Sequence, residues 1–317
     1  MRPPRTPTRP FAALLGALLV MLPGCDSPGG VEGPMPGRPH FDGAPALASV
    51  ERQVAFGPRI PGTPGHAAQL AWMRALLDSV ADTVVADDFT HVSAVGDTLH
   101  LTNLVARFLP DRERRILLLT HWDTRPVSDQ AKDPAQRKLP VPGANDGASG
   151  TAILLELARM LGEDPPPLGV DLLFVDGEDY GEGDMFLGSV RYADQLPPKG
   201  QGRPIYAVLL DMVGDADGRF PVDPTSVQAA PIVVQKVWRT ARKLGYAKSF
   251  PEGVGPPVTD DHVPLLEAGL PAIDVIDFSY GPANAYWHTP EDTPDKVSAE
   301  TLGMVGEVMA ELIYSGG

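Results

Sequence analysis

Two uninterrupted apolar runs, separated by a helical pattern, mark the middle of the chain. Residues 116–120 and 170–175 are almost wholly apolar, which is typical of strands that are buried on both faces. Between them, residues 153–161 place their apolar side chains at helical spacing. A strand, a helix and a second strand in this order indicate a βαβ unit of a parallel sheet. We therefore expect ligands to bind at the carboxyl ends of these strands.

The segments on either side continue this alternation of strands and helices. Apolar residues at helical or alternating spacing predict one element after another, without an internal repeat. The predicted helices cover residues 47–55, 70–77, 187–195, 227–244, 260–269 and 301–314. The predicted strands cover residues 84–92, 99–109, 206–210 and 270–276. We therefore predict a single-domain α/β fold, in which a mixed, mostly parallel sheet is flanked by helices on both faces.

The N-terminus has the pattern of an export signal. Arg2, Arg5 and Arg9 precede an apolar run over residues 11–22, which is too short to cross a bilayer but is typical of a secretory signal. Cys25 follows this run and resembles the lipidation site of a bacterial lipoprotein. We expect an exported protein that a lipid on Cys25 holds on a membrane, on its periplasmic or cell-surface side. The alternative is an ordinary signal peptide with an incidental cysteine.

These features divide the chain into three parts. Residues 1–25 are the predicted lipoprotein-type signal peptide. Residues 26–45 are a flexible linker, because a segment so rich in Gly and Pro can bury little apolar surface. Residues 46–317 are the predicted globular domain. The sole cysteine lies in the leader, so an intrachain disulfide is impossible.

Composition and charge narrow the range of partners. The chain has 317 residues, 43% of them hydrophobic, and a formal net charge of −15. This charge excludes nucleic acid as a partner and argues against electrostatic docking on an anionic membrane, which leaves a lipid anchor as the only expected contact with a membrane. An acidic protein suits recognition of a cationic group such as a peptide α-ammonium. A solubilising acidic surface is the more common explanation of such a total charge.

Metal-seeking side chains stand at the predicted strand ends or in the adjacent loops. Zinc prefers imidazole nitrogen and carboxylate oxygen, and a catalytic site leaves one position open. The candidates are His121, Asp146, Glu178 or Asp179, Asp211 and His288. Each has a simpler explanation by itself, such as a turn at Asp146 or a helix cap at Asp260. The adjacent pair Glu178 and Asp179 strengthens the metal hypothesis, because one carboxylate can bind a cation while the other moves protons.

Several short motifs together resemble one known family. They are His121-Trp122-Asp123, Gly143-Ala144-Asn145-Asp146, Asp176-Gly177-Glu178-Asp179, Leu210-Asp211-Met212, Asp260-Asp261-His262 and Trp287-His288-Thr289. Their order and spacing resemble the zinc family that is shared by bacterial leucyl-type aminopeptidases and glutaminyl cyclases of animal type. The likeness covers the chain from about Phe56 onward, and it is strongest to the bacterial glutaminyl-peptide cyclotransferases.

The resemblance implies a role for each matching residue. Asp146, Asp179 and His288 would bind one zinc ion, and Glu178 would be the general acid and base. Asp211 and Asp260 would join a hydrogen-bond network beside the substrate α-amine. The walls of the substrate pocket would come from Trp287, Tyr180 and Phe186. The implied fold is that of zinc-dependent exopeptidases, the implied substrates are the N-termini of peptides or proteins, and we expect a monomer.

Three departures from the animal cyclases leave the substrate open. Gly147 stands where those enzymes carry a serine, and Asp274 stands where they carry a histidine. The loop after Asp179 lacks the tryptophan that usually lines the cyclase pocket. The net direction of the pKa of Glu178 is also open, because zinc would lower it while burial and nearby acids would raise it.

Two alternatives to a cyclase remain. An aminopeptidase of the same family would use two zinc ions, with His121 and Asp211 as ligands of the second and Asp146 between them. Glu178 would then activate water. A binding ectodomain without catalysis is the other alternative, although such relatives lose metal ligands and this chain has kept them.

Overall fold

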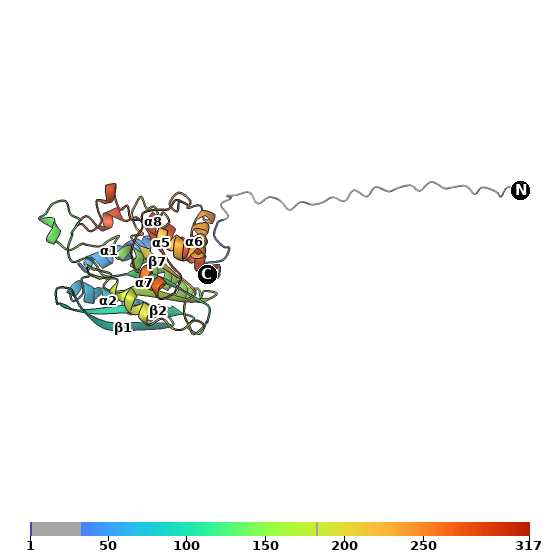
Figure 1. Ribbon diagram of the computed structural model, residues 1–317, viewed down its shortest axis with the longest axis horizontal. Helices are drawn as coiled ribbons and strands as arrows, with labels where there is room; N and C mark the ends of the chain where they lie inside the picture. The colour runs from blue at the N-terminus through green and yellow to red at the C-terminus, as the bar shows by residue number, and fades with distance from the viewer. Residues whose placement is uncertain (2–32, 182) are drawn as a thin grey trace. The chain divides into compact units, whose positions relative to one another are not determined.

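The protein is built around one large sheet, which we describe from a computed structural model. The structure describes residue 1, residues 33–181 and residues 183–317. Within these residues the sheet has the strand order β1-β2-β4-β3-β7-β8 (Figure 1). Its strands are β1 (Thr83–Val92), β2 (Thr98–Phe108), β3 (Arg115–His121), β4 (Gly169–Val175), β7 (Ala207–Asp211) and β8 (Ala272–Ile276). A small hairpin of β5 (Asp179–Gly181) and β6 (Asp184–Met185) lies in the segment that we expected to be a loop.

The sheet is mixed, as the sequence predicts. Strand β3 pairs in parallel with β4 and β7, and β7 pairs in parallel with β8. Strands β1 and β2 form an antiparallel extension at one edge. Every residue of β3, β4 and β7 is buried, which explains the uninterrupted apolar runs. Because the parallel strands point the same way, their carboxyl ends meet at one edge.

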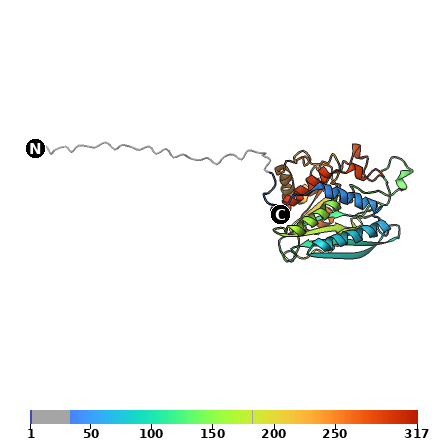
Figure 2. The same cartoon turned by 180° about the vertical axis from the view of Figure 1, so that it is seen from behind.

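Helices cover both faces of the sheet. They are α1 (Gly43–Ala55), α2 (Pro64–Val80), α3 (Ala148–Glu163), α4 (Leu187–Asp194), α5 (Pro224–Ala229), α6 (Pro231–Lys243), α7 (His262–Glu267) and α8 (Ala299–Tyr314). Short 3-10 turns are η1 (Gln136–Lys138), η2 (Pro282–Asn284) and η3 (Pro294–Lys296). The larger hydrophobic core joins α1, α2, α3, α6 and α8 to one face, where Figure 2 shows the first three close together. A smaller core joins α4 and α7 to the other face.

The predicted helix over residues 227–244 is wrong in extent. The segment forms two helices, α5 and α6, which are separated at Ala230. Pro231 explains the break, because proline has no N–H to donate inside a helix but fits the first helical turn. The other helices agree with the predicted positions, apart from shifts at their ends.

The folded domain begins earlier than the predicted boundary at residue 46. Helix α1 starts at Gly43, and the segment before it packs against α8. The buried guanidinium of Arg38 donates to Glu307 over 2.6 Å and to Glu311 over 2.5 Å. The main-chain N–H groups of Met35 and Phe41 donate to the same two carboxylates. The second half of the predicted linker therefore packs on the domain, and we call residues 35–41 the strap. Ion pairs and hydrogen bonds to Glu307 and Glu311 hold it, which its Gly and Pro content did not indicate.

Two further observations concern membranes and charge. Among the described residues we find no helix with the length and apolar character needed to cross a bilayer. Cys25 and the predicted signal peptide lie outside those residues.

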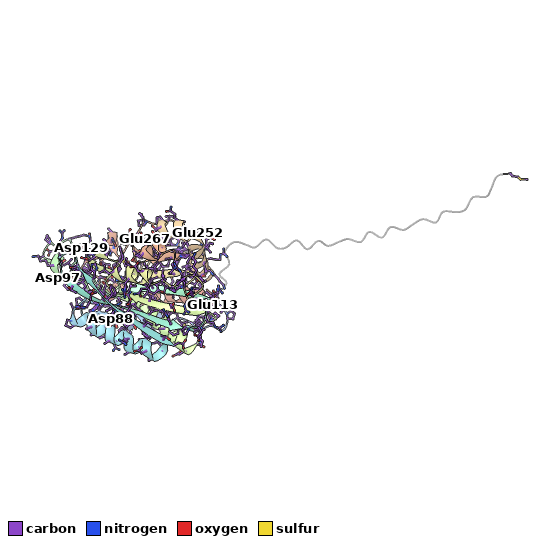
Figure 3. The ribbon with its side chains drawn as sticks, turned by 60° about the horizontal axis from the view of Figure 1, so that its bottom comes forward. Asp88, Asp97, Glu113, Asp129, Glu252 and Glu267 are labelled. Atoms are coloured by element: carbon purple, nitrogen blue, oxygen red, sulfur yellow. The ribbon has the colours of Figure 1, made fainter. Side chains whose placement is uncertain are left out.

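Acidic side chains are spread over several elements, among them Asp88 on β1 and Glu267 on α7 (Figure 3). This spread fits a solubilising surface better than one acidic docking patch.

The strap should contribute strongly to stability. Burial alone would raise the pKa of Glu307 and of Glu311, but the hydrogen bonds from Arg38 and from the main chain lower both. We expect Arg38→Met to reduce the free energy of unfolding by about 3–5 kcal/mol at neutral pH, because it leaves two buried carboxylates without their partner. This loss should shrink as the pH falls through the carboxyl range, since lowered pKa values stabilise the fold only above it.

Urea unfolding followed by circular dichroism, at neutral pH and at about pH 4.5, measures this effect. Arg74→Met is the matched control, because the contact of Arg74 with Asp78, at 3.9 Å, is exposed. Equal unfolding midpoints for the two variants would show that the strap does not stabilise the domain.

Candidate metal centre

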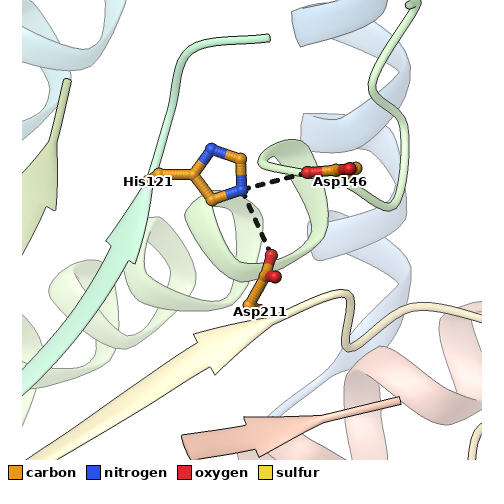
Figure 4. Close-up of side chains that lie close together, drawn as sticks. All are labelled: His121, Asp146 and Asp211. Atoms are coloured by element: carbon orange, nitrogen blue, oxygen red, sulfur yellow. Dashed lines mark hydrogen bonds and ion pairs between the residues drawn. The ribbon is translucent and has the colours of Figure 1, made fainter. Parts of the chain in front are cut away.

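The first group of metal-seeking side chains comes from three different elements. His121 is the last residue of β3, Asp211 is the last residue of β7, and Asp146 lies just before α3. The Nε2 atom of His121 lies 3.1 Å from Oδ1 of Asp211 and 3.2 Å from Oδ1 of Asp146 (Figure 4). All three residues are buried. The carboxyl ends of parallel strands thus bring distant residues together, as the βαβ pattern predicts.

A second group shares Asp146 with the first. The Nε2 atom of His288 lies 3.4 Å from Oδ2 of Asp146 and 3.5 Å from Oδ1 of Asp179. Within each group, the possible ligand atoms lie within 4.8 Å of one another. Asp146 therefore turns one oxygen toward each imidazole. This arrangement can hold one ion, or two ions with Asp146 between them.

The loop that carries Asp146 is held by Asp292, which the sequence did not single out. Asp292 accepts the main-chain N–H groups of Asn145, over 2.8 Å, and of Asp146, over 3.2 Å. It also accepts the hydroxyl of Tyr280 over 2.8 Å. Burial and the charge of Asp146 raise the pKa of Asp292 to about 7. The anchor thus keeps the carboxylate of Asp146 free for a cation.

Asp123 plays the corresponding part for the acidic turn after β4. Its two oxygens accept the main-chain N–H groups of Glu178 and Asp179, each over 3.1 Å. Its Oδ1 atom also lies 3.5 Å from Nδ1 of His121. One buried carboxylate therefore orients residues of both metal-seeking groups. Its position two residues after His121 was a signal that the sequence offered.

Gly147 has a structural reason for replacing a serine. Its φ of 88° lies in the left-handed region that favours glycine. A Cβ atom there would lie 2.7 Å from the carbonyl oxygen of Asp123 and 3.0 Å from Cε1 of His121. A serine cannot occupy this position unless the loop moves away from His121. The hydroxyl of the animal enzymes therefore has no counterpart at this position.

Glu178 is buried beside the first group. Its Oε2 atom lies 3.7 Å from Nδ1 of His121. Burial raises the pKa of Glu178 well above its usual range, and the charges of Asp179, Asp261 and Asp211 raise it further, although His121 lowers it. The direction that the sequence left open is therefore upward, and a bound cation would reduce it. A carboxyl group with a raised pKa is a stronger base than an ordinary glutamate and can take up and release a proton.

Asp260 lies among other buried acids. Burial raises its pKa, and among the neighbouring charges those of Asp211 and Asp274 raise it most. The pKa of Asp274 is raised in the same way, and its carboxyl oxygens have no hydrogen-bond partner within the described residues. Asp274 stands where the animal cyclases carry a histidine, so this chain replaces a base by a carboxyl group that favours its neutral form.

The three predicted pocket residues differ in position. Trp287 is half-buried and stacks on His288 with ring centroids 4.0 Å apart, and Phe278 contacts Trp287 edge-on at 4.9 Å. Phe186, at the start of α4, donates its main-chain N–H to the carbonyl of Glu178 over 3.1 Å. The pKa of Tyr180 is raised by burial and by the charges of Asp97 and Asp184. The structure thus places Trp287 against His288 and adds Phe278, which we did not predict, against Trp287; their role as pocket walls stays a prediction.

The donors fit zinc in number, type and burial. Imidazole nitrogens and carboxylate oxygens are its usual ligands. Oδ2 of Asp179 is buried and accepts no hydrogen bond from the described residues, so a ligand atom is left for a cation. Burial alone would lower the pKa of His288, but the charges of Asp179, Asp129 and Asp146 raise it to about 10. A proton therefore competes with a metal ion for this imidazole.

Two charged residues of the loop after β3 were also missed. Arg125 donates to Asp179 over 2.5 Å, and Asp129 lies 3.3 Å from Nδ1 of His288. The only sequence signal for this pair was an arginine and an aspartate four residues apart in a polar loop. Each contacts a proposed ligand: Arg125 contacts Asp179, and Asp129 contacts His288.

Comparisons with known proteins agree with this geometry. The model of peptidase family M28 matches residues 103–313. The crystal structure of Tannerella forsythia glutaminyl cyclase is 37% identical, covers 88% of this chain and 100% of its own, and superposes with a TM-score of 0.83. A Zn-dependent exopeptidase from Parabacteroides distasonis is 35% identical, with coverage of 87% and 99% and a TM-score of 0.83. A glutaminyl-peptide cyclotransferase-like protein of Bos taurus is 28% identical over 283 residues, which are 80% of this chain and 70% of its own.

Removal of a proposed ligand should abolish tight zinc binding. We expect purified Asp146→Ala and His288→Ala to lose most of their bound zinc, measured by elemental analysis after dialysis. In the unaltered protein, affinity for zinc should weaken steadily as the pH falls below about 10, because the raised pKa of His288 favours the protonated ring. His100→Ala, which removes an exposed imidazole from β2, is the control. Full zinc content in both ligand variants would contradict the assignment.

Proposed function

Because the chain belongs to peptidase family M28, we propose that it is a zinc-dependent glutaminyl-peptide cyclotransferase. It converts the N-terminal glutamine of peptides and proteins to pyroglutamate and releases ammonia. One observation supports this function most strongly. The buried carboxyl group of Glu178 lies next to the group of possible metal ligands formed by Asp146, Asp179 and His288. The similarity to bacterial glutaminyl cyclases over almost their entire length supports the choice of substrate.

The reaction needs no nucleophile from the protein. The α-amine of the substrate attacks its own γ-amide carbonyl, so a bond forms between the α-nitrogen and the δ-carbon while the bond from that carbon to the amide nitrogen breaks. Asp146, Asp179 and His288 would hold a zinc ion, which would supply the Lewis acid that makes this carbonyl more electrophilic. The only cysteine of the chain lies in the leader, which fits a reaction without covalent catalysis.

Glu178 moves the proton. It accepts a proton from the attacking amine and donates it to the departing nitrogen, which leaves as ammonia. Its raised pKa suits both halves of this transfer, because a carboxyl group with a raised pKa is a stronger base and still an effective acid. Its main chain is held by Asp123, so the carboxyl group starts from a fixed position.

The remaining residues bind and orient the substrate. Asp211 and Asp260 belong to the acidic group beside Glu178 and attract the substrate ammonium before it loses its proton. Trp287 and Phe278 supply an apolar wall beside His288 for the aliphatic part of glutamine. Tyr180 and Phe186 flank the acidic turn and contact the substrate residues that follow the N-terminal glutamine. The enzyme acts as a monomer.

One observation favours a second candidate. The group of His121, Asp146 and Asp211 is complete, so the chain retains the ligands for a second zinc ion. With two ions, Glu178 would serve as the base for a water molecule, and the enzyme would be an aminopeptidase that releases N-terminal residues. A binding ectodomain without catalysis is disfavoured, because the donors of both groups are present.

The substitution Glu178→Gln tests the mechanism. It preserves shape but cannot carry the proton, so we expect turnover to fall at least about a hundredfold while zinc content and substrate binding persist. Gln-initiated peptides and chromogenic aminoacyl substrates should be assayed together, with ammonia and free amino acid measured in each. Glu156→Gln on α3 is the control. Near-normal ammonia release by zinc-loaded Glu178→Gln would overturn the role of Glu178, and release of amino acids alone by the unaltered protein would favour the aminopeptidase.

We also propose that the mature protein is an exported lipoprotein, anchored through Cys25 on the periplasmic or cell-surface side of a membrane. The apolar run before Cys25 and the position of this single cysteine support the proposal. Several acyl chains on one cysteine anchor more firmly than one chain can.

The substitution Cys25→Ser should move the protein from the membrane fraction to the soluble fraction and should remove the mass of the lipid from the mature chain. Fractionation and intact mass spectrometry measure both effects. Unchanged fractionation together with an unchanged mature mass would leave only an ordinary signal peptide.

A further inference from the structure

A continuous chain of charged side chains runs behind two of the proposed zinc ligands. Arg125 Nη1 lies 2.5 Å from Oδ1 of Asp179. The same guanidinium donates to Oδ2 of Asp129 through Nε, over 3.0 Å, and through Nη2, over 2.7 Å. Oδ1 of Asp129 lies 3.3 Å from Nδ1 of His288. Asp179 and His288 are thus connected through Arg125 and Asp129, although they come from distant parts of the sequence.

The atoms that this chain of contacts occupies are informative. Arg125 takes Oδ1 of Asp179, whereas Oδ2 of the same carboxylate is buried and accepts no hydrogen bond from the described residues. Asp129 faces Nδ1 of His288, whereas Nε2 of the same ring faces Asp146 and Asp179. One polar atom of each ligand is thus turned to the Arg125–Asp129 pair. Oδ2 of Asp179 and Nε2 of His288 remain for an ion, although Oδ1 of Asp179 also lies 3.5 Å from Nε2 of His288.

The backbone at His288 gives the side chain a reason to need such support. Its φ of 51° lies in the left-handed region, which is unusual for a residue other than glycine. Trp287 stacks on one side of the ring, and a stacking contact does not select which nitrogen faces the ion. A carboxylate at Nδ1 makes that selection, and residues of this kind commonly tune the ligands of metal sites.

We propose that Arg125 and Asp129 are positioning residues for the zinc site, and that they determine which atom of Asp179 and of His288 binds the ion. The inference rests on the proposed zinc ligands and adds two residues to that site. Arg125 contacts one oxygen of Asp179 and leaves the other, Oδ2, for the ion. Asp129 holds the imidazole with Nε2 toward the ion. The pair carries opposite charges, so it orients both ligands without adding net charge.

The chain offers a matched control for a merely structural ion pair. Arg115 and Asp171 form a contact of the same chemistry, with distances of 2.8 and 3.1 Å, and both side chains are only 3% exposed. Arg115 is the first residue of β3, whereas the metal-seeking groups lie at the other end of that strand. Loss of Arg115 therefore removes a buried guanidinium without touching a metal ligand.

The test compares zinc affinity in Arg125→Met, Asp129→Ala, Asp129→Asn and Arg115→Met. Competition with a chromogenic zinc chelator measures the affinity, and circular dichroism checks the fold of each variant. We expect zinc to bind about 10–100-fold more weakly to Arg125→Met and Asp129→Ala, but with unchanged affinity to folded Arg115→Met. Asp129→Asn should recover part of the loss, because its amide oxygen can still lie against Nδ1, which has no hydrogen-bond partner among the described residues.

Cobalt substitution supplies a readout that a structural role would not change. The visible absorption bands of bound Co²⁺ depend on its ligands, so Arg125→Met and Asp129→Ala should alter these bands while Arg115→Met keeps them. Asp129 is partly exposed, with 35% of its side chain accessible, so Asp129→Ala decides the test if Arg125→Met does not fold. Unaltered zinc affinity and cobalt bands in folded Asp129→Ala would overturn the proposal.

Neither measurement uses glutaminyl or aminoacyl substrates, so the result is independent of which reaction the enzyme catalyses. Failure of the unaltered protein to bind zinc would instead refute the zinc site on which the proposed function depends. Tight binding by the unaltered protein and by all variants would refute only the positioning role of Arg125 and Asp129.

Discussion

Mutual repulsion among buried carboxylates is the constraint on which the metal centre depends. Asp146, Glu178, Asp179 and Asp211 meet where the parallel strands end, and little water is available there to screen them. Burial and the charge of Asp146 raise the pKa of Asp179 to about 7, even though His288 and Arg125 lower it. Such a group is stable only if protons or cations balance its charge. The same imbalance that costs stability gives the site its affinity for a divalent cation.

The surrounding structure reduces the cost in stability of these buried charges, because it fixes the main chain next to the proposed ligands. Asp123 and Asp292 accept main-chain N–H groups next to the proposed ligands, so the ligand side chains keep their oxygens for the ion. Gly147 lets the loop before α3 approach His121 more closely than a residue with a side chain would allow. The ligands are therefore placed by contacts that do not consume their own donor atoms, which is the condition for a preorganised metal site.

One set of residues is compatible with two reactions because both need the same proton carrier. Glu178 lies beside both metal-seeking groups, and it can receive a proton from a substrate amine or from water. The reactions differ in the nucleophile, and exclusion of water favours the amine. Trp287 and Phe278 are the aromatic side chains that lie beside His288. Choice between the reactions thus depends on the surroundings of the ligands more than on the ligands themselves.

The sequence by itself determined the fold class and the donors, because buried parallel strands require uninterrupted apolar runs and place their following residues at one edge. It also located Asp146, Asp179 and His288 through motifs that resemble a known family. It missed the break at Pro231 inside an otherwise periodic segment, and it missed the strap around Arg38 because its ion-pair partners lie more than 260 residues away. Only the tertiary structure decided that Arg125 and Asp129 lie behind the ligands and that the pKa of Glu178 is raised. Local pattern reports the periodicity of one element, whereas burial and charge contacts depend on which elements pack together.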